Sequence, residues 1–191
     1  MLANVVFLDR DGVINRDSAD YILSLAQFEF LPGSLAALRR LTACGFPLIV
    51  VTNQSALGRG WISADELARI HDHLRSAAAA AGARILDILV CPHHPSEGCA
   101  CRKPLPGLLH AAAAAHAVDF RSAVLIGDSR RDIQCARRAG VGTTILVRTG
   151  NGERAAEELA AEGIVPDRVA DDLAQAADWL IAQRSRPHPA R

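Results

Sequence analysis

Residues 5–12, Val-Val-Phe-Leu-Asp-Arg-Asp-Gly, decide the fold and introduce the chemistry. Four consecutive apolar residues are typical of a strand that is buried on both faces, as in a parallel sheet. The run ends in Asp9, Arg10 and Asp11, at the end of the strand where open α/β sheets bind their ligands. Gly12 then permits a sharp backbone turn. The stretch predicts a central strand that delivers two carboxylates to a ligand site.

Short apolar runs alternate with helical segments along the rest of the chain. The predicted strands are residues 4–8, 46–52, 85–90, 123–126 and 143–147, and the predicted helices are residues 34–43, 64–81, 107–116, 131–139, 153–162 and 172–183. The second predicted helix has a clear start signal, because Ser63 and Glu66 form a capping box at its N-terminus. This alternation predicts an α/β fold, with helices on both faces of a mainly parallel sheet.

Two segments without periodicity, residues 15–30 and 91–106, are predicted to be functional loops. Residues 1–184 are expected to form a single domain that includes the second loop. Residues 185–191 carry two prolines and no apolar residue larger than alanine, which predicts a frayed tail.

The composition limits the class of partner. The chain has 191 residues, of which 50% are hydrophobic, and its 21 Lys and Arg balance 21 Asp and Glu. No summed positive charge attracts nucleic acid or anionic lipid. No apolar run approaches the roughly 20 residues that span a bilayer, and no secretion signal precedes the first strand. We expect a cytoplasmic monomer that acts on a small soluble molecule.

The aspartates after the first strand suit the hydrolysis of a phosphate monoester. That reaction needs an anionic nucleophile, a proton donor for the leaving oxygen and a cation that lets two anions approach. Asp9 can attack phosphorus, and Asp11 can protonate the leaving group and then deprotonate water. Paired aspartates also bind metal without chemistry or simply cap a turn, so the pair alone decides nothing.

Polar clusters follow the other strands. Thr52, Asn53, Gln54 and Ser55 end the second strand and can donate hydrogen bonds to phosphate oxygens, although such a cluster also serves as a turn or helix cap. Arg102 and Lys103 close the second loop and supply fixed positive charge.

The fourth strand ends in a further acid, Asp128, which can complete a magnesium shell with Asp9 and the Asp11 carbonyl. Asp132, one helical turn later, is either an additional metal contact or an N-terminal charge on its helix.

The second loop contains a candidate zinc site. Prolines keep its start extended, so alternate side chains share a face and Cys91 lies beside His93. Cys99 and Cys101 pair in the same way, and a glycine permits the turn that would join the pairs. Three thiolates and one imidazole fill a tetrahedron, which predicts a structural zinc. Unliganded thiols, a redox pair, or His94 in place of His93 remain alternatives.

Together these residues resemble the haloacid dehalogenase superfamily over about residues 5–147. Its four motifs match Asp9 with Asp11, Thr52, Lys103 and Asp128. The resemblance implies a Rossmann-like three-layer sandwich and a magnesium-dependent phosphoric monoester hydrolase. It also implies that Asp9 is the nucleophile, that Asp11 is the acid and base, and that Thr52 and Lys103 stabilise the phosphoryl group.

Within that superfamily, the segments FLDRDGVIN (residues 7–15), TNQS (52–55) and the cysteine loop resemble the D-glycero-D-manno-heptose 1,7-bisphosphate 7-phosphatases. This implies a protein without a large cap domain that removes the 7-phosphate of a sugar bisphosphate during the synthesis of nucleotide-activated heptose for lipopolysaccharide. The residues expected to bind substrate are Asp17, Tyr21, Asn53, Gln54, Ser55 and Arg102, the last as the reader of the distal phosphate.

Two departures leave the preferred anomer open: the zinc loop is short, and Ser129 follows Asp128 where other members have lysine. Histidinol-phosphate phosphatase, which shares the aspartate and zinc motifs, is an alternative function. A non-catalytic, zinc-stabilised binding module is an alternative of another class, although a decayed site has no reason to keep the four motif residues. A phosphatase of nucleic-acid ends is disfavoured by the neutral charge and the 4% of aromatic residues.

Overall fold

The computed structural model describes residues 1–184. The tail predicted for residues 185–191 lies outside the described residues. Among the residues described, no helix has both the length and the apolar character needed to cross a membrane.

One sheet organises this part of the chain. All of its strand pairs are parallel, and the strands lie in the order β3-β2-β1-β4-β5-β6. Their bounds are β1 Val6–Leu8, β2 Leu48–Asn53, β3 Ile85–Cys91, β4 Val124–Gly127, β5 Thr143–Val147 and β6 Arg168–Ala170. The prediction of a mainly parallel sheet is confirmed, and β6 is an edge strand that was not predicted. The direction of strand succession reverses between β1 and β4, where α/β sheets of this kind open a ligand crevice.

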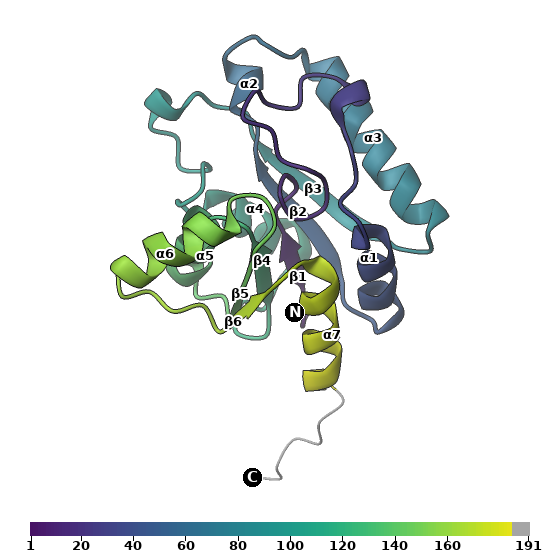
Figure 1. The fold of residues 1–191 in the computed structure, drawn as a ribbon, viewed down its shortest axis with the longest axis vertical. Helices are drawn as coiled ribbons and strands as arrows, with labels where there is room; N and C mark the ends of the chain where they lie inside the picture. The colour runs from purple at the N-terminus through teal and green to yellow at the C-terminus, as the bar shows by residue number, and fades with distance from the viewer. Residues whose placement is uncertain (185–191) are drawn as a thin grey trace.

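Helices cover both faces of the sheet (Figure 1). Their bounds are α1 Ser34–Ala43, α2 Ser55–Gly58, α3 Ala64–Ala80, α4 Gly107–His116, α5 Arg130–Ala139, α6 Gly152–Ala161 and α7 Leu173–Arg184. Helices α1, α3 and α7 pack on one face, and α4, α5 and α6 pack on the other. Figure 1 shows α1 and α7 side by side, in agreement with their extensive mutual contact. The three-layer sandwich is therefore confirmed, and the short α2 was not predicted.

Alternation along the central strands explains the two cores. Val6 and Leu8 point toward α1, α3 and α7, whereas Val5 and Phe7 point toward α4 and α5, and all four side chains are fully buried. Because both faces of β1 are covered, its sequence is an unbroken apolar run rather than an alternating one.

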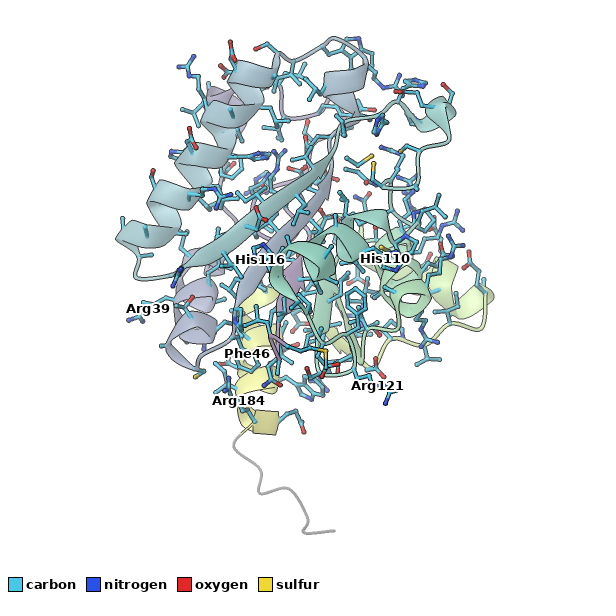
Figure 2. The ribbon with its side chains drawn as sticks, turned by 180° about the vertical axis from the view of Figure 1, so that it is seen from behind. Arg39, Phe46, His110, His116, Arg121 and Arg184 are labelled. Carbon is cyan, nitrogen blue, oxygen red and sulfur yellow. The ribbon has the colours of Figure 1, made fainter. Side chains whose placement is uncertain are left out.

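Local signals set the helix ends, and side-chain contacts hold the C-terminal ends of α4 and α7. The hydroxyl of Ser63 accepts a hydrogen bond from the Glu66 amide at 3.1 Å, which is half of the predicted capping box of α3. The Glu66 side chain instead accepts from the Leu25 amide at 2.9 Å. In the view from behind, His116 lies at the end of α4, where it bonds Asp87 of β3 at 2.9 Å (Figure 2). Arg184 stacks on Phe46, with 4.9 Å between its guanidinium carbon and the ring centroid (Figure 2).

Candidate active site and metal centres

The loop after β1 lies where the order of successive strands in the sheet reverses, between β1 and β4. The amide of Asp9 donates to the carbonyl of Ile126 in β4 at 3.0 Å, so the loop starts beside the end of that strand. Gly12 has a φ of 79°, and a Cβ at this position would lie 2.1 Å from Oδ2 of Asp128. Only glycine permits this close approach of the first loop to the fourth strand end. The topology thereby brings Asp9 and Asp128 together, as predicted.

Lys103 lies beneath Asp9 and is 2% exposed. Its Nζ is 2.8 Å from Oδ2 of Asp9 and 2.6 Å from Oδ1 of Asp132, and it donates to the carbonyl of Val51 at 2.9 Å. Burial alone would lower the pKa of Lys103, but the carboxylates of Asp132 and Asp9 raise it above the ordinary value for lysine. The ammonium group is therefore a permanent positive charge at the nucleophile candidate.

Asp132 is the residue for which the sequence left two roles open. Its Oδ1 contacts Lys103, and its Oδ2 accepts hydrogen bonds from the amide and hydroxyl of Ser129 at 3.1 and 2.6 Å. The second contact caps α5, so the N-terminal role is present. The contact with Lys103 was not predicted from the sequence: Asp132 also forms an ion pair with this lysine.

The carboxylates at this end of the sheet fit a hard divalent cation. Ligand oxygens of Asp9, Asp128 and Asp132 all lie within 4.8 Å of one another. Burial, followed by repulsion from Asp132, raises the pKa of Asp128 to about 7. Burial likewise raises the pKa of Asp9, and the charge of Lys103 only partly opposes it. Oδ1 of Asp128 accepts no hydrogen bond from residues 1–184. An oxygen-rich, under-neutralised cluster with a free oxygen is the donor set that magnesium prefers.

A polar cavity of about 170 Å³ opens above these acids. Eight predicted site residues line it: Asp9, Asp11, Asp17, Tyr21, Thr52, Asn53, Gln54 and Asp128. Three of the predicted catalytic and substrate-binding residues do not: Lys103 and Ser55 are buried, and Arg102 is partly buried. Nη1 of Arg102 is buried and has no hydrogen-bond partner among the described residues. The substrate-binding roles of Ser55 and Arg102 stay predictions.

Amide side chains orient the groups around the cavity. Nε2 of Gln54 donates to the hydroxyl of Thr52 at 2.9 Å, which leaves the hydroxyl proton of Thr52 available for another acceptor. Asn53 bonds both main-chain groups of Lys103, accepting from its amide at 3.1 Å and donating to its carbonyl at 3.2 Å. Asn53 thus positions the lysine as well as lining the cavity, and its predicted substrate contact stays a prediction.

Asn151 is a functional candidate that the sequence reading missed. Its amide N–H donates to Oδ2 of Asp128 at 2.8 Å, and its side chain donates to Asp17 at 2.7 Å. Gly150 beside it would place a Cβ 2.2 Å from the same Asp128 oxygen. The sequence does carry a signal for it, because Thr149, Gly150 and Asn151 follow β5, just as the predicted site residues lie at the ends of β1, β2 and β4.

The second loop gathers the four predicted zinc ligands. Sγ of Cys91 is 3.6 Å from Sγ of Cys99 and 3.7 Å from Nδ1 of His93, and that nitrogen is 3.2 Å from Sγ of Cys101. These sulfur separations are far beyond a disulfide length of about 2.05 Å, and the thiols are free. His94 instead contacts Ser96 at 2.7 Å. The cluster of three sulfurs and one nitrogen could hold a metal, and its chemistry suits tetrahedral zinc.

Comparisons with known proteins agree with this geometry. Residues 100–176 match the model of the HAD-hydrolase-like family. The D-glycero-β-D-manno-heptose-1,7-bisphosphate 7-phosphatase of Bordetella bronchiseptica is 42% identical over 94% of this chain and 98% of its own. The D-glycero-α-D-manno-heptose-1,7-bisphosphate 7-phosphatase of Burkholderia mallei is 39% identical over 84% of this chain and 88% of its own. The crystal structure of the D,D-heptose 1,7-bisphosphate phosphatase of B. bronchiseptica, complexed with magnesium and phosphate, matches with a TM-score of 0.87 over 94% of this chain and 99% of that one.

The fold and the acidic site at its reversal point define a phosphatase of the haloacid dehalogenase (HAD) class. The resemblance read from the motifs is therefore confirmed. Within this class, the chain belongs to the family of D-glycero-D-manno-heptose-1,7-bisphosphate 7-phosphatases.

Proposed function

We propose that the protein removes the 7-phosphate of D-glycero-D-manno-heptose 1,7-bisphosphate, through an aspartyl-phosphate on Asp9, in the synthesis of nucleotide-activated heptose for lipopolysaccharide. The observation that carries the proposal is that Asp9 and Asp128 line one polar cavity while the buried Lys103 forms an ion pair with Asp9. The relation to heptose bisphosphatases over nearly the whole chain supports the substrate.

The first step transfers the phosphoryl group to the protein. An oxygen of Asp9 bonds to phosphorus as the bond from phosphorus to the C7 oxygen breaks, and Asp11 donates its proton to that leaving oxygen. Lys103 stays ion-paired at 2.8 Å from Asp9, and the free hydroxyl proton of Thr52 is available to a phosphoryl oxygen. Both groups stabilise negative charge that spreads over the transferring group.

The second step returns the protein to its starting state. Asp11, now ionised, takes a proton from a water molecule, whose oxygen attacks phosphorus and releases inorganic phosphate from Asp9. Asp11 regains its proton, Asp9 regains its charge, and one water is consumed for each ester cleaved.

Two metals complete the proposal. Asp9, Asp128 and the main-chain carbonyl of Asp11 would hold magnesium, which when bound supplies the positive charge that lets a carboxylate approach a phosphate. Cys91, His93, Cys99 and Cys101 would hold a structural zinc. Because the cysteine loop runs directly into Arg102 and Lys103, its closure around a metal would fix both cations relative to the cavity.

Substrate choice is assigned to the loops at the cavity mouth. The unpartnered, buried Nη1 of Arg102 supports this residue as the reader of the distal phosphate. Asp17 and Tyr21 line the cavity from the first loop and face the sugar in this proposal. We also propose a cytoplasmic monomer whose partner is this small sugar phosphate.

The test compares phosphate release from the α and β heptose bisphosphates and from histidinol phosphate, with magnesium present. A higher kcat/KM for either heptose anomer than for histidinol phosphate is expected. Preference for histidinol phosphate would overturn the substrate, and the Asp9→Asn variant controls for contaminating phosphatase. Release of phosphate from none of the three would reject the proposed reaction.

A further inference from the structure

Arg10 is a charged residue at the site that the mechanism above does not use. It stands between Asp9 and Asp11 in the chain, yet its side chain is 0% exposed and does not line the cavity. A buried guanidinium without partners would be strongly destabilising, so the groups that pair with Arg10 indicate its role.

The guanidinium group makes a forked contact with the neighbouring carboxylate. Its Nη2 lies 2.9 and 3.0 Å from the two oxygens of Asp11, and its Nε lies 3.1 Å from Oδ1. Gln54 donates to Oδ2 at 2.7 Å and Asn15 donates to Oδ1 at 2.8 Å. Arg10, Gln54 and Asn15 thus all donate hydrogen bonds to the carboxylate of Asp11, while its side chain keeps 21% of its surface exposed and lines the cavity.

His71 of helix α3 contacts the other terminal nitrogen of the guanidinium group. Nη1 of Arg10 lies 3.1 Å from Nε2 of His71, and arginine can only donate, so that nitrogen must be the unprotonated acceptor. Burial, together with the charge of Arg10, lowers the pKa of His71 to about 4, which keeps the ring neutral. The Phe28 ring centroid, 5.9 Å from Cζ of Arg10, adds a cation–π contact.

We propose that Arg10, braced by the neutral imidazole of His71, is a positioning residue that sets the orientation of the Asp11 carboxyl for proton transfer to the leaving oxygen. The bidentate fork restricts rotation of the carboxyl, and the acceptor on α3 restricts rotation of the fork. Arg10 touches neither substrate nor metal in this assignment. It rests on the proposed function only in that Asp11 is taken as the acid.

A positioning role for the acid predicts a dependence on the leaving group, which a purely structural ion pair does not. An alkyl phosphate needs a proton at its leaving oxygen, whereas p-nitrophenyl phosphate releases a stable anion without one. General acid catalysis contributes about 10²–10⁴-fold. Misplacing Asp11 should therefore slow the transfer of an alkyl phosphate by about 100-fold and that of the aryl phosphate by less than about tenfold.

The experiment measures formation of the aspartyl-phosphate in single turnovers by rapid quench, which isolates the first step from the later attack of water. Arg10→Met and Arg10→Lys remove the fork, His71→Leu removes its acceptor, and Asp11→Asn sets the limit for complete loss of the acid. Arg69→Met, an arginine on the exposed side of α3, is the matched control and should leave both rates unchanged.

A loss for the alkyl phosphate at least tenfold greater than for the aryl phosphate in the Arg10 variants supports the proposal. His71→Gln, whose amide oxygen can still accept from Arg10, should recover most of the alkyl rate that His71→Leu loses. Equal losses for both substrates would overturn the proposal, because they would reflect general damage to the site. If Arg10→Met does not fold, the same comparison in Arg10→Lys and His71→Leu decides. Inactivity of the parent protein toward both substrates would instead reject the proposed phosphatase function.

Discussion

The neutral His71 makes the stability of the protein depend on pH with a predictable sign. The folded state lowers the pKa of His71 from the ordinary 6.5 to about 4. The groups that produce this environment are Arg10 and Arg75, which lower the pKa, and Asp11, which raises it; burial is the largest cause. Between pH 6.5 and 4 the unfolded chain therefore binds a proton at His71 that the folded protein does not.

The magnitude follows from the pKa difference. One pKa unit corresponds to about 1.4 kcal/mol, so the difference between 6.5 and about 4 corresponds to about 3.4 kcal/mol. The ring is only partly buried, and solvent screening reduces the expected contribution to about 2–3 kcal/mol. The free energy of unfolding contributed by this group is fully present above pH 6.5 and is lost as the pH falls toward 4.

The assay is urea unfolding of the parent protein and of His71→Gln between pH 4 and 7.5, without added magnesium. Glutamine keeps an acceptor for Arg10 but does not titrate. The raised pKa values of Asp9 and Asp128 act in the opposite direction, because these acids lose stability as the pH rises. Their contributions are common to both proteins and cancel in the difference. A difference that stays within about 0.5 kcal/mol over the whole range, or that has the opposite slope, would refute the neutral-acceptor reading of His71.

Four further predictions concern the site. Asp9→Asn should abolish turnover without changing the circular dichroism spectrum, and near-normal activity would remove it as the nucleophile. Cys99→Ser should lower zinc content, measured by elemental analysis, and the melting temperature together; a parent protein that purifies without zinc would contradict the cluster. Arg102→Ala should raise KM for a bisphosphate at least tenfold more than for a monophosphate, and equal changes would exclude it as the reader of the distal phosphate. Lys103→Met leaves buried carboxylates unpaired and should cost about 3–5 kcal/mol in urea unfolding, a loss that additional magnesium should partly restore.

The central fold was predictable because each strand of a parallel sheet that is covered on both faces is a nearly continuous apolar run in the sequence. Residues 143–147 and 107–116, predicted as a strand and a helix, have those bounds in the structure. The apolar pattern is too weak to predict an element that is buried on one side only or that is very short. Strand β6 has three residues, of which only Ala170 is buried, and α2 has four residues, so neither offers enough positions for a periodic pattern.

The candidate site divides in the same way. Asp9, Thr52 and Asp128 could be predicted because each lies at or just after the carboxyl end of a buried strand, and parallel strands bring such positions to one edge. The partner of Arg10 could not be predicted: His71 is 61 positions away, and although Leu67, Ile70 and Leu74 mark the buried face of α3, nothing in the sequence shows that the first loop meets this face. Contacts of this kind depend on the packing of α3 against the first loop, which no local pattern encodes.

The two aspartates of the first loop show how position in the fold, rather than residue type, separates their roles. Asp9 faces two buried carboxylates and one lysine, an arrangement that leaves it short of positive charge and suits it to share a cation. Asp11, two residues later, accepts hydrogen bonds from Arg10, Asn15 and Gln54 and, among residues 1–184, is not part of the carboxylate cluster. A group that shares a cation must stay ionised to attack phosphorus, whereas a group that moves a proton must hold one orientation through two steps. Asp9 and Asp11 are the same residue type, so their different roles come from the turn at Gly12 and from the packing of α3.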